Sequence, residues 1–394
     1  MNESLADACA LIQSPFITLA SGAVSRLPET PEQAEAWHQW SAAEIDALTL
    51  AYAARRPLLV RGEPGTGKTQ LARAAAVHLG WKLHVETIQP RFEPGDLVAR
   101  FDAVRRLADA QAGERVLDDR RYWRPGVLWL AFGWRSAQDF LPAGEREVKA
   151  KAEKGERGEN DEQDEKDEKG EKGEKGEKGE RGEPRGHVVL IDEIDKADSD
   201  LPNSLLEVLA QRSFRVPPLA EPVGGPRVQA PLIVITTNEE RELPAAFLRR
   251  CIVLTLQADP RLSYRDWLLA RGRAHFARLP DGAREELLAD DMLALAADQL
   301  VRDRAAVSAA GLPPPGLAEY LDLLYAVREL LPDDGVAQRA WLQRLSAYAY
   351  LKHATGDGLP AEASQARTPL PAAAADASAA QPATGGTATA QPTA

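Results

Sequence analysis

Short apolar runs recur through the first two thirds of the chain, separated by turns and by helical stretches. The runs cover 58–60, 83–87, 187–191, 231–236 and 252–254. Each is short enough for a strand, and the run at 187–191 is typical of a parallel strand buried on both faces. The pattern therefore predicts five strands in this part of the chain.

Helical spacing of apolar residues occupies the intervals between several of these runs. The segments 37–54, 70–79 and 201–212 place apolar side chains three and four residues apart, which predicts amphipathic helices. Beyond residue 260 the helical pattern is unbroken, which predicts a second, all-helical domain. Its expected helices cover 265–278, 283–302, 316–331 and 337–352.

Two stretches have compositions that do not support a folded core. Residues 145–185 consist almost entirely of charged residues and glycine, with a Gly-Glu-Lys repeat, and residues 358–394 are rich in Ala, Pro and Thr. Neither stretch can bury enough apolar surface to offset the entropy of ordering its backbone. We expect a disordered insert and a flexible tail.

The turn after the run 58–60 matches the phosphate-binding pattern G-x-x-x-x-G-K-[ST] without a mismatch. Glycines let backbone N–H groups point at a phosphate chain, the lysine supplies a charge for the β and γ phosphates, and the threonine hydroxyl can reach Mg²⁺. The helix that follows directs its positive end at the same phosphates. The expected nucleotide-binding residues are Gly62, Glu63, Pro64, Gly65, Thr66, Gly67, Lys68 and Thr69.

Lysine usage strengthens this interpretation over a chance match. Outside the charged insert the chain uses arginine for nearly all of its positive charge, yet a lysine stands at the position where phosphate chemistry requires one. The four lysines outside 145–185 are Lys68, Lys82, Lys196 and Lys352.

Polar residues end two of the apolar runs. Asp192 and Glu193 follow the run 187–191, and Asn238 follows the run 231–236. In open α/β sheets ligands bind at the carboxyl ends of strands. We expect Asp192 to hold Mg²⁺, Glu193 to act as the general base on water and Asn238 to help orient that water. The nearby Asp195, like Asp198 and Asp200, is expected to cap the next helix.

Two further groups admit two interpretations each. Arg249 and Arg250 precede the fifth strand and either face a neighbouring subunit or form a solvated basic pair, the first being favoured. Tyr122 and Trp123 either project into a pore or pack in the core. For the nearby Trp129, as for Phe132, core packing is favoured, and His84 is expected to be a partly buried histidine without a chemical role.

Charge and composition narrow the class of protein. The net charge of −12 argues against a general DNA-binding surface. Two cysteines, Cys9 and Cys251, do not make a disulfide framework or a metal site. With neither a signal peptide pattern nor a membrane-spanning apolar run, we expect a soluble cytoplasmic protein.

The order of these motifs resembles that of the AAA+ ATPases. The spans 62–69, 190–198, 201–207 and 246–251 are similar to those of the MoxR-type branch, and the resemblance covers roughly residues 37–352. It implies a P-loop αβα sandwich with a five-stranded parallel sheet, followed by a smaller helical lid. It also implies ATP and Mg²⁺ at a subunit interface, with arginines acting on the neighbouring subunit's nucleotide. The ring is usually a hexamer, and MoxR-type proteins are chaperone-like remodellers, often with a von Willebrand factor A domain partner.

This resemblance gives the expected domain boundaries. They are a lead-in over 1–36, a nucleotide-binding domain over 37–258 that contains the insert 145–185, a lid over 259–357 and the tail 358–394.

The chain departs from the family pattern at the lid. The segment 313–319, where a lid helix begins, contains no arginine that could sense ATP. Other hypotheses are a nucleic-acid-associated motor or nuclease-linked NTPase, and a nucleotide switch with little turnover. The acidic composition disfavours the first, and the Asp192–Glu193 pair disfavours the second.

Overall fold

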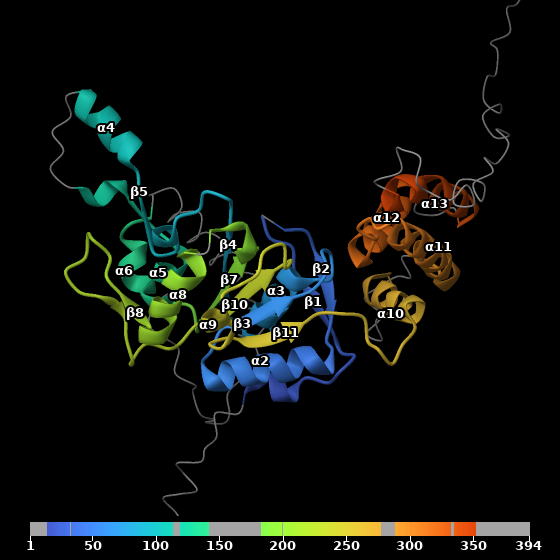
Figure 1. Cartoon of the computed structure of the whole chain (residues 1–394), viewed down its shortest axis with the longest axis horizontal. Helices are drawn as coiled ribbons and strands as arrows, with labels where there is room; N and C mark the ends of the chain where they lie inside the picture. The colour runs from blue at the N-terminus through green and yellow to red at the C-terminus, as the bar shows by residue number, and fades with distance from the viewer. Residues whose placement is uncertain are drawn as a thin grey trace, which may run out of the picture.

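A computed structural model describes residues 14–31, 33–112, 119–141, 183–198, 200–276, 288–331 and 335–351. In these residues an α/β domain is followed by a helical domain, which lies to the right of the sheet in Figure 1. The expected tail, and the expected insert up to residue 182, lie outside the described residues.

Five parallel strands form the central sheet, as the sequence predicts. They are β3 (Leu58–Arg61), β4 (Lys82–Thr87), β7 (His187–Asp192), β10 (Leu232–Thr237) and β11 (Ile252–Thr255). Their order across the sheet is β11-β3-β10-β7-β4. After β3 the chain forms β4 at one edge of the sheet, then β7 and β10 between β4 and β3, and last β11 at the opposite edge. The connections from β3 and from β10 therefore run in opposite directions across the sheet, and the point where they diverge lies between these two strands. Such a switch point is where α/β sheets bind ligands.

Alternate residues of the three central strands, β3, β7 and β10, enter two separate cores, which makes the domain a three-layer sandwich. Leu58, Val60 and Leu190 pack with helices α2 (Ala42–Ala54) and α3 (Lys68–Leu79). Leu59 and Ile191 face the opposite layer. Because side chains alternate across a strand, a continuous apolar run satisfies both layers at once. The opposite layer contains α5 (Val127–Phe132), α6 (Trp134–Gln138), α8 (Asp200–Gln211) and α9 (Ala245–Leu248).

The segment before the sheet corrects one prediction. Residues 37–39 belong to a strand, β2 (Ala36–Gln39), which pairs antiparallel with β1 (Val24–Leu27), and the helix α2 begins only at Ala42. The helix starts there because Ser41 and Glu44 form a capping box, a signal that is legible in the sequence. A short 3₁₀ helix, η1 (Pro15–Thr18), packs on α2.

The antiparallel strand pair β5 (Ala99–Phe101) and β6 (Trp123–Pro125) and the helix α4 (Ala103–Gln111) project from the α/β domain on the side away from the lid, at the upper left of Figure 1. The helix α4 lies between β5 and β6 in the chain. Tyr122 is fully buried here and its hydroxyl donates to Asp109. The pore interpretation of Tyr122 is therefore wrong, because packing places the ring inside. Trp129 and Phe132 are core residues, as expected.

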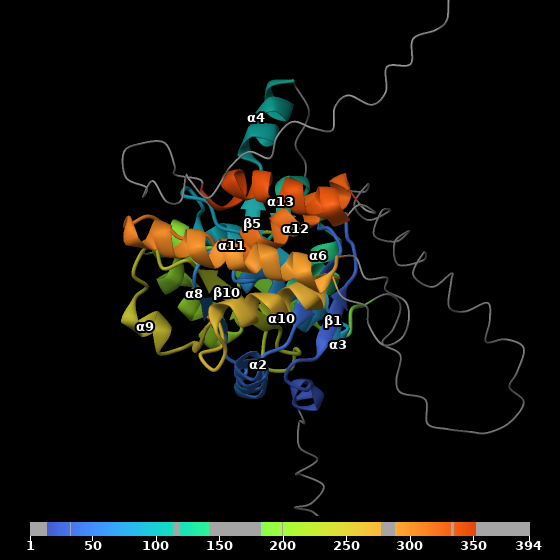
Figure 2. The ribbon, with the colours of Figure 1, turned by 90° about the vertical axis from the view of Figure 1, so that its right-hand side faces the viewer.

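Within the described residues four helices form the lid, and Figure 2 shows where these helices lie. Their buried side chains form a core of their own. The helices are α10 (Tyr264–Phe276), α11 (Asp290–Ala309), α12 (Leu317–Leu330) and α13 (Gly335–Tyr350). Helix α11 begins at Asp290 and continues to Ala309, beyond the predicted end at 302, while the predicted start at 283 lies outside the described residues. The acidic residues Asp290 and Asp291 occupy its first turn, where negative charge suits the positive end of a helix.

Short elements complete the described chain: η2 (Pro94–Leu97), η3 (Asp119–Tyr122), η4 (Ile194–Lys196), β8 (Ser213–Phe214) and β9 (Val223–Gly224). Within the described ranges no helix combines the length and apolarity needed to cross a bilayer.

Candidate nucleotide site

The predicted phosphate loop lies between β3 and α3, beneath the lid. Its glycines are required by geometry: Gly62 has φ 144°, and a Cβ on it would lie 2.4 Å from the carbonyl oxygen of Leu256. Gly65 has φ 76°, and its Cβ would lie 2.6 Å from the Ala318 Cβ of α12. Other residues therefore cannot adopt this backbone so close to its neighbours. Thr66 closes the loop by donating to the Glu63 carbonyl at 2.8 Å.

Lys68 points back into the loop. Its ammonium donates to the carbonyls of Gly62 and Glu63 at 2.8 and 3.0 Å, and the residue is 7% exposed. Burial lowers the pKa of this ammonium, and the Asp192 carboxylate opposes that effect. The lysine is thus held as a desolvated cation at the position where a phosphate chain would enter.

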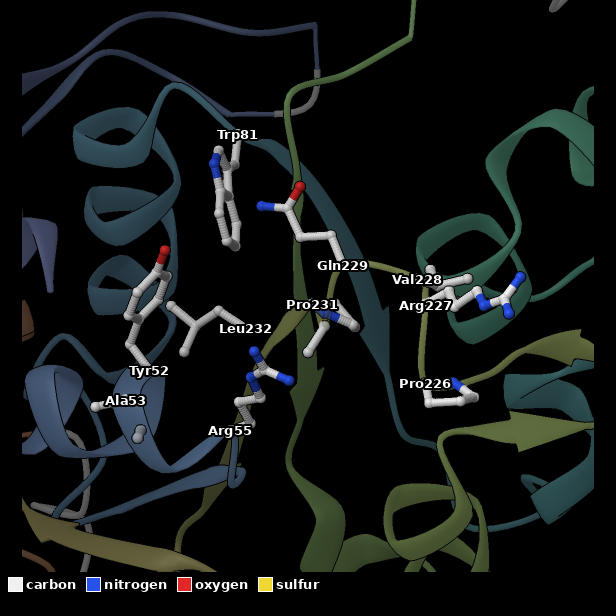
Figure 3. Close-up of a pocket in the computed structure, with 12 residues that line it drawn as sticks. Tyr52, Ala53, Arg55, Trp81, Pro226, Arg227, Val228, Gln229, Pro231 and Leu232 are labelled. Carbon is white, nitrogen blue, oxygen red and sulfur yellow. The ribbon is translucent and has the colours of Figure 1, made fainter. Parts of the chain in front are cut away.

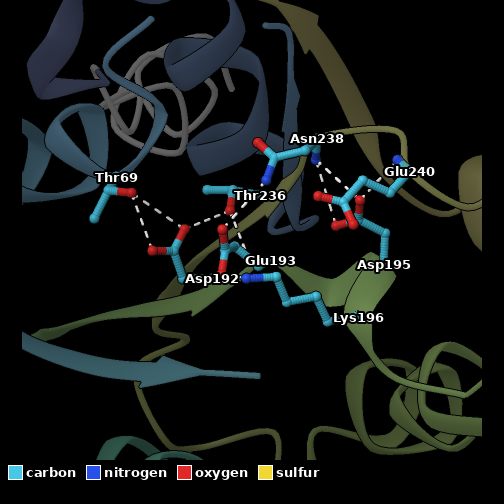
Figure 4. A network of polar contacts seen from close by, with 8 residues as sticks. All are labelled: Thr69, Asp192, Glu193, Asp195, Lys196, Thr236, Asn238 and Glu240. Carbon is cyan, nitrogen blue, oxygen red and sulfur yellow. Dashed lines mark hydrogen bonds and ion pairs between the residues drawn. The ribbon is translucent and has the colours of Figure 1, made fainter. Parts of the chain in front are cut away.

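The two acidic residues at the end of β7 are tied to β10 by hydrogen bonds (Figure 4). The Thr69 hydroxyl donates to Asp192 at 3.0 Å, and the Thr236 hydroxyl donates to the same carboxylate. The backbone N–H of Glu193 in turn donates to Thr236 at 2.9 Å. Thr236 therefore joins both acidic residues to the neighbouring strand.

Glu193 is held from two sides. Asn238 donates its side-chain amide to one carboxylate oxygen at 3.2 Å, and Lys196 forms an ion pair with the other. Glu193 itself has φ 60°, a left-handed conformation that is uncommon outside glycine. Such backbone strain concentrates at functional sites because the surroundings must enforce it.

The prediction that Asp195 caps the next helix is wrong. The Asp195 carboxylate instead accepts from the backbone N–H groups of Asn238 and Glu240 at 3.2 and 2.9 Å. Asp195 is only 2% exposed, so these bonds fix the turn that presents Asn238. His84 is buried as expected and its ring nitrogen lies 3.0 Å from that of His187.

A cavity of about 440 Å³ brings these groups together with the lid. Its size is suited to a ligand of nucleotide dimensions. The α/β domain contributes Pro64, Gly65, Gly67, Lys68, Thr69, Gln70, Asp192, Glu193, Thr236 and Asn238, together with Glu35 and Ala36. The lid contributes His275, Leu317, Ala318, Leu321, Asp322 and Tyr325.

The lid residues that line this cavity include neither arginine nor lysine, as the segment 313–319 suggests. Arg304 of α11 instead reaches the phosphate loop from outside. Its Nη2 donates to both carboxylate oxygens of Glu63, at 2.9 and 2.8 Å, and its Nη1 donates to the Pro315 carbonyl. The same guanidinium lies over the Tyr264 ring. No spacing in the sequence signals this contact, because its partners are 241 residues apart.

The predicted arginine pair does not join the cavity. Arg249 and Arg250 are exposed at the end of α9 and do not belong to the residues that line it.

Thr236 and Lys196 are functional candidates that were not predicted from the sequence. The polar Thr-Thr-Asn ending of the run 231–236 was the available signal for Thr236.

The donor set fits Mg²⁺ and a phosphate chain. Thr69 and Asp192 offer hard oxygen ligands, while Lys68 and the loop N–H groups offer positive charge.

A second cavity of about 400 Å³ lies elsewhere, beside Trp81, Tyr52 and Leu232 (Figure 3). It opens at the amino ends of β4 and β10, opposite the edge at which such sheets bind ligands.

Residues 57–251 match the family model described as AAA domain, dynein-related subfamily. No curated protein sequence matches the chain. Among solved structures, NtrX from Brucella abortus is 12% identical with a TM-score of 0.36, covering 75% of this chain and 51% of that one. A RuvB mutant from Thermotoga maritima is 16% identical with a TM-score of 0.36, covering 76% of this chain and 66% of that one. The chain thus spans between half and two thirds of the length of these structures.

The match begins just before the strand that leads into the phosphate loop and ends just after the exposed arginine pair, so it includes every catalytic and nucleotide-binding residue named from the sequence. Residues 57–251 of this chain therefore match an AAA domain, the nucleotide-binding domain of the AAA+ ATPases.

Proposed function

We propose that the protein is an ATP-hydrolysing, MoxR-like AAA+ protein that assembles into a ring, most simply a hexamer, and remodels a protein partner in the cytoplasm. The observation that carries the proposal is the connection of Thr69, Asp192, Thr236 and Glu193 by hydrogen bonds at the carboxyl edge of the sheet, opposite Lys68. Phosphate binding and water activation require these groups in one place.

In this proposal each side chain has a distinct task. Lys68 exchanges its two loop carbonyls for phosphate oxygens when ATP enters. Glu193 accepts a proton from the attacking water, and Asn238 fixes the orientation of its carboxylate. Mg²⁺, held by Thr69 and Asp192, would supply positive charge to the phosphates.

The arginine pair supports a ring. Arg249 and Arg250 lie outside the cavity of their own subunit and are exposed, so they are free to serve a neighbour's nucleotide. An arginine supplied in this way stabilises negative charge in the transition state and is worth about 10³-fold or more in rate. Head-to-tail contacts that place each arginine at the next site close into rings.

Mixing two inactive variants tests the ring. Arg249→Ala/Arg250→Ala retains Lys68, and Lys68→Ala retains the arginines, so each protein alone should hydrolyse ATP slowly. In randomly mixed rings about a quarter of interfaces combine both intact halves, and turnover should rise accordingly. The matched control is the triple variant mixed with Arg249→Ala/Arg250→Ala, which offers no intact pair of halves and should stay inactive.

The outcome is read together with native mass spectrometry of the mixture. Mixed rings that remain inactive would rule out action in trans, and full turnover by a strictly monomeric form would rule out the ring. The partner is sought by pull-down of the native complex, with a von Willebrand factor A domain protein as the first candidate. Stimulation of ATP turnover by nucleic acid, in place of protein, would contradict the remodelling role.

A further inference from the structure

Arg56 contacts the backbone of both candidate catalytic arginines. It lies in the three-residue link between α2 and β3, and its guanidinium reaches the turn between α9 and β11. Its Nε donates to the Arg250 carbonyl at 3.0 Å, and its Nη2 donates to the Arg249 carbonyl. The planar fork of an arginine is suited to binding two acceptors at once.

These carbonyls need a partner for a structural reason. The helix α9 covers only Ala245–Leu248, and Arg249 is its C-terminal cap residue. The last carbonyls of a helix have no partner within the helix, and they carry its negative end. The Arg56 guanidinium therefore satisfies the two carbonyls and complements their charge.

The link that carries Arg56 is itself fixed. Arg55 adopts a left-handed conformation with φ 53°, and the N–H of Arg56 donates to the Ala51 carbonyl at 3.0 Å. On the other side, the N–H of Ile252 donates to the Pro57 carbonyl at 2.8 Å. Two consecutive residues thus hold the turn: Arg56 binds the arginine pair itself, and Pro57 binds the backbone just after it.

The side chains of the pair, by contrast, have little support of their own. Both residues are exposed, and among the described residues their guanidinium groups make one hydrogen bond, from Arg250 to the Ala246 carbonyl at 3.4 Å. Within the described part of the chain neither guanidinium has a carboxylate partner. Their direction is consequently set by their backbone, and the backbone is held by Arg56.

We propose that Arg56 is a positioning residue: it fixes the peptide groups of Arg249 and Arg250 so that their side chains reach a neighbouring subunit's nucleotide. This rests on the proposed function, in which the pair acts in trans. Arg56 lies just before β3, the strand that leads into the subunit's own phosphate loop. In this proposal it therefore connects that loop to the arginines that act on the neighbouring subunit.

Trans-complementation tests the proposal, because it separates a misplaced arginine from a damaged nucleotide site. Arg56→Ala should lower kcat about 10- to 100-fold, the scale of a misplaced catalytic group, with ATP affinity unchanged. Mixing it with Lys68→Ala should restore turnover, as for Arg249→Ala/Arg250→Ala. A chain carrying both Arg56→Ala and Lys68→Ala should restore nothing to Arg249→Ala/Arg250→Ala.

Two further variants separate positioning from folding. Arg56→Lys keeps the charge but not the fork, so its turnover should lie between those of the wild type and Arg56→Ala. Arg55→Asn is the matched control: it removes the adjacent exposed guanidinium, and asparagine tolerates the left-handed backbone. This control should keep wild-type turnover. The thermal midpoint of each variant is measured alongside.

The outcomes are distinguishable. Full turnover in Arg56→Ala, or a loss that Lys68→Ala subunits do not restore, overturns the positioning role while the ring stands. Should Arg56→Ala fail to fold, the same mixing with Arg56→Lys decides the question. Failure of Arg249→Ala/Arg250→Ala to be restored by Lys68→Ala in mixed rings overturns the trans mechanism itself, and the role of Arg56 with it.

Discussion

Thr236 shows how a single hydroxyl can organise this site at the residue scale. It is fully buried, donates to the Asp192 carboxylate and accepts from the backbone N–H of Glu193. One side chain on β10 therefore sets both the candidate Mg²⁺ ligand and the candidate base on β7. Because a buried hydroxyl is costly without partners, its position is strongly determined by these two bonds.

Thr236→Val keeps the shape of this side chain and removes both hydrogen bonds. Asp192 then loses a donor and the Glu193 N–H loses its acceptor. We expect the free energy of unfolding to fall by about 1–3 kcal/mol and kcat to fall more than ATP affinity. Thr236→Ser, which keeps the hydroxyl, is the control for stability by thermal denaturation and for steady-state turnover. Equal turnover in the two variants would contradict this role for the hydroxyl.

Glu193→Gln tests the base directly. The amide retains the size of the side chain but cannot accept a proton from water, so turnover should fall about 10²-fold or more while ATP still binds. Steady-state hydrolysis and equilibrium nucleotide binding are measured on the same preparation. Unchanged hydrolysis would exclude Glu193 as the base. Lys196→Met, which removes only the ion pair to Glu193, separates the effect of that pair.

At the element scale, the lid meets the phosphate loop through two contacts. The start of α12 lies against Gly65, and Arg304 of α11 pairs with Glu63. The second contact joins a lid helix to the loop whose carbonyls hold Lys68. Opening of the lid would break this ion pair.

Arg304→Glu should open the lid while leaving the fold intact. The Glu63 side chain is largely exposed, so the pair contributes only about 0.2–1 kcal/mol to stability, but its loss leaves two carboxylates facing each other. We expect faster amide hydrogen exchange in the phosphate loop and a raised KM for ATP. The charge swap Glu63→Arg/Arg304→Glu should reverse part of both effects. No reversal would show that the pair does not hold the lid.

At the whole-molecule scale, the cavity is closed by parts of two domains, each with a core of its own. A ligand that binds both domains stabilises their closed arrangement, and any ligand that binds only the folded state raises stability by mass action. ATP is therefore expected to stabilise the whole chain as well as the loop it contacts.

ATP at about one hundred times its dissociation constant should raise the free energy of unfolding by about 2.7 kcal/mol. Lys68→Ala should lose most of this stabilisation because the phosphates lose their buried cation. The measurement is the thermal midpoint with and without Mg²⁺ and ATP, with Lys82→Ala as a control that removes a lysine elsewhere in the domain. An equal shift in Lys68→Ala and wild type would contradict the nucleotide site.

Local patterns in the sequence are enough to predict the five strands, the phosphate loop and the positions of Asp192, Glu193 and Asn238 at strand ends. Continuous apolar runs predict strands buried on both faces, and a loop that approaches phosphate so closely needs glycine at particular positions. The same reasoning failed where local signals compete. Trp37 has helical spacing relative to Trp40, yet the Ser41 capping box starts the helix after both of them.

The tertiary structure decided the contacts between segments far apart in the chain. Arg304 meets Glu63 and Arg56 meets Arg249 across 241 and 193 residues, and no spacing rule relates such pairs. The burial of Tyr122 and the bonds from Asp195 to the turn after β10 likewise depend on segments distant in the chain. The sequence by itself determined which chemistry the chain carries, because glycine, lysine and carboxylate requirements are local. Only the folded chain determined what holds those groups in place, because burial and hydrogen bonding depend on every segment packed around them.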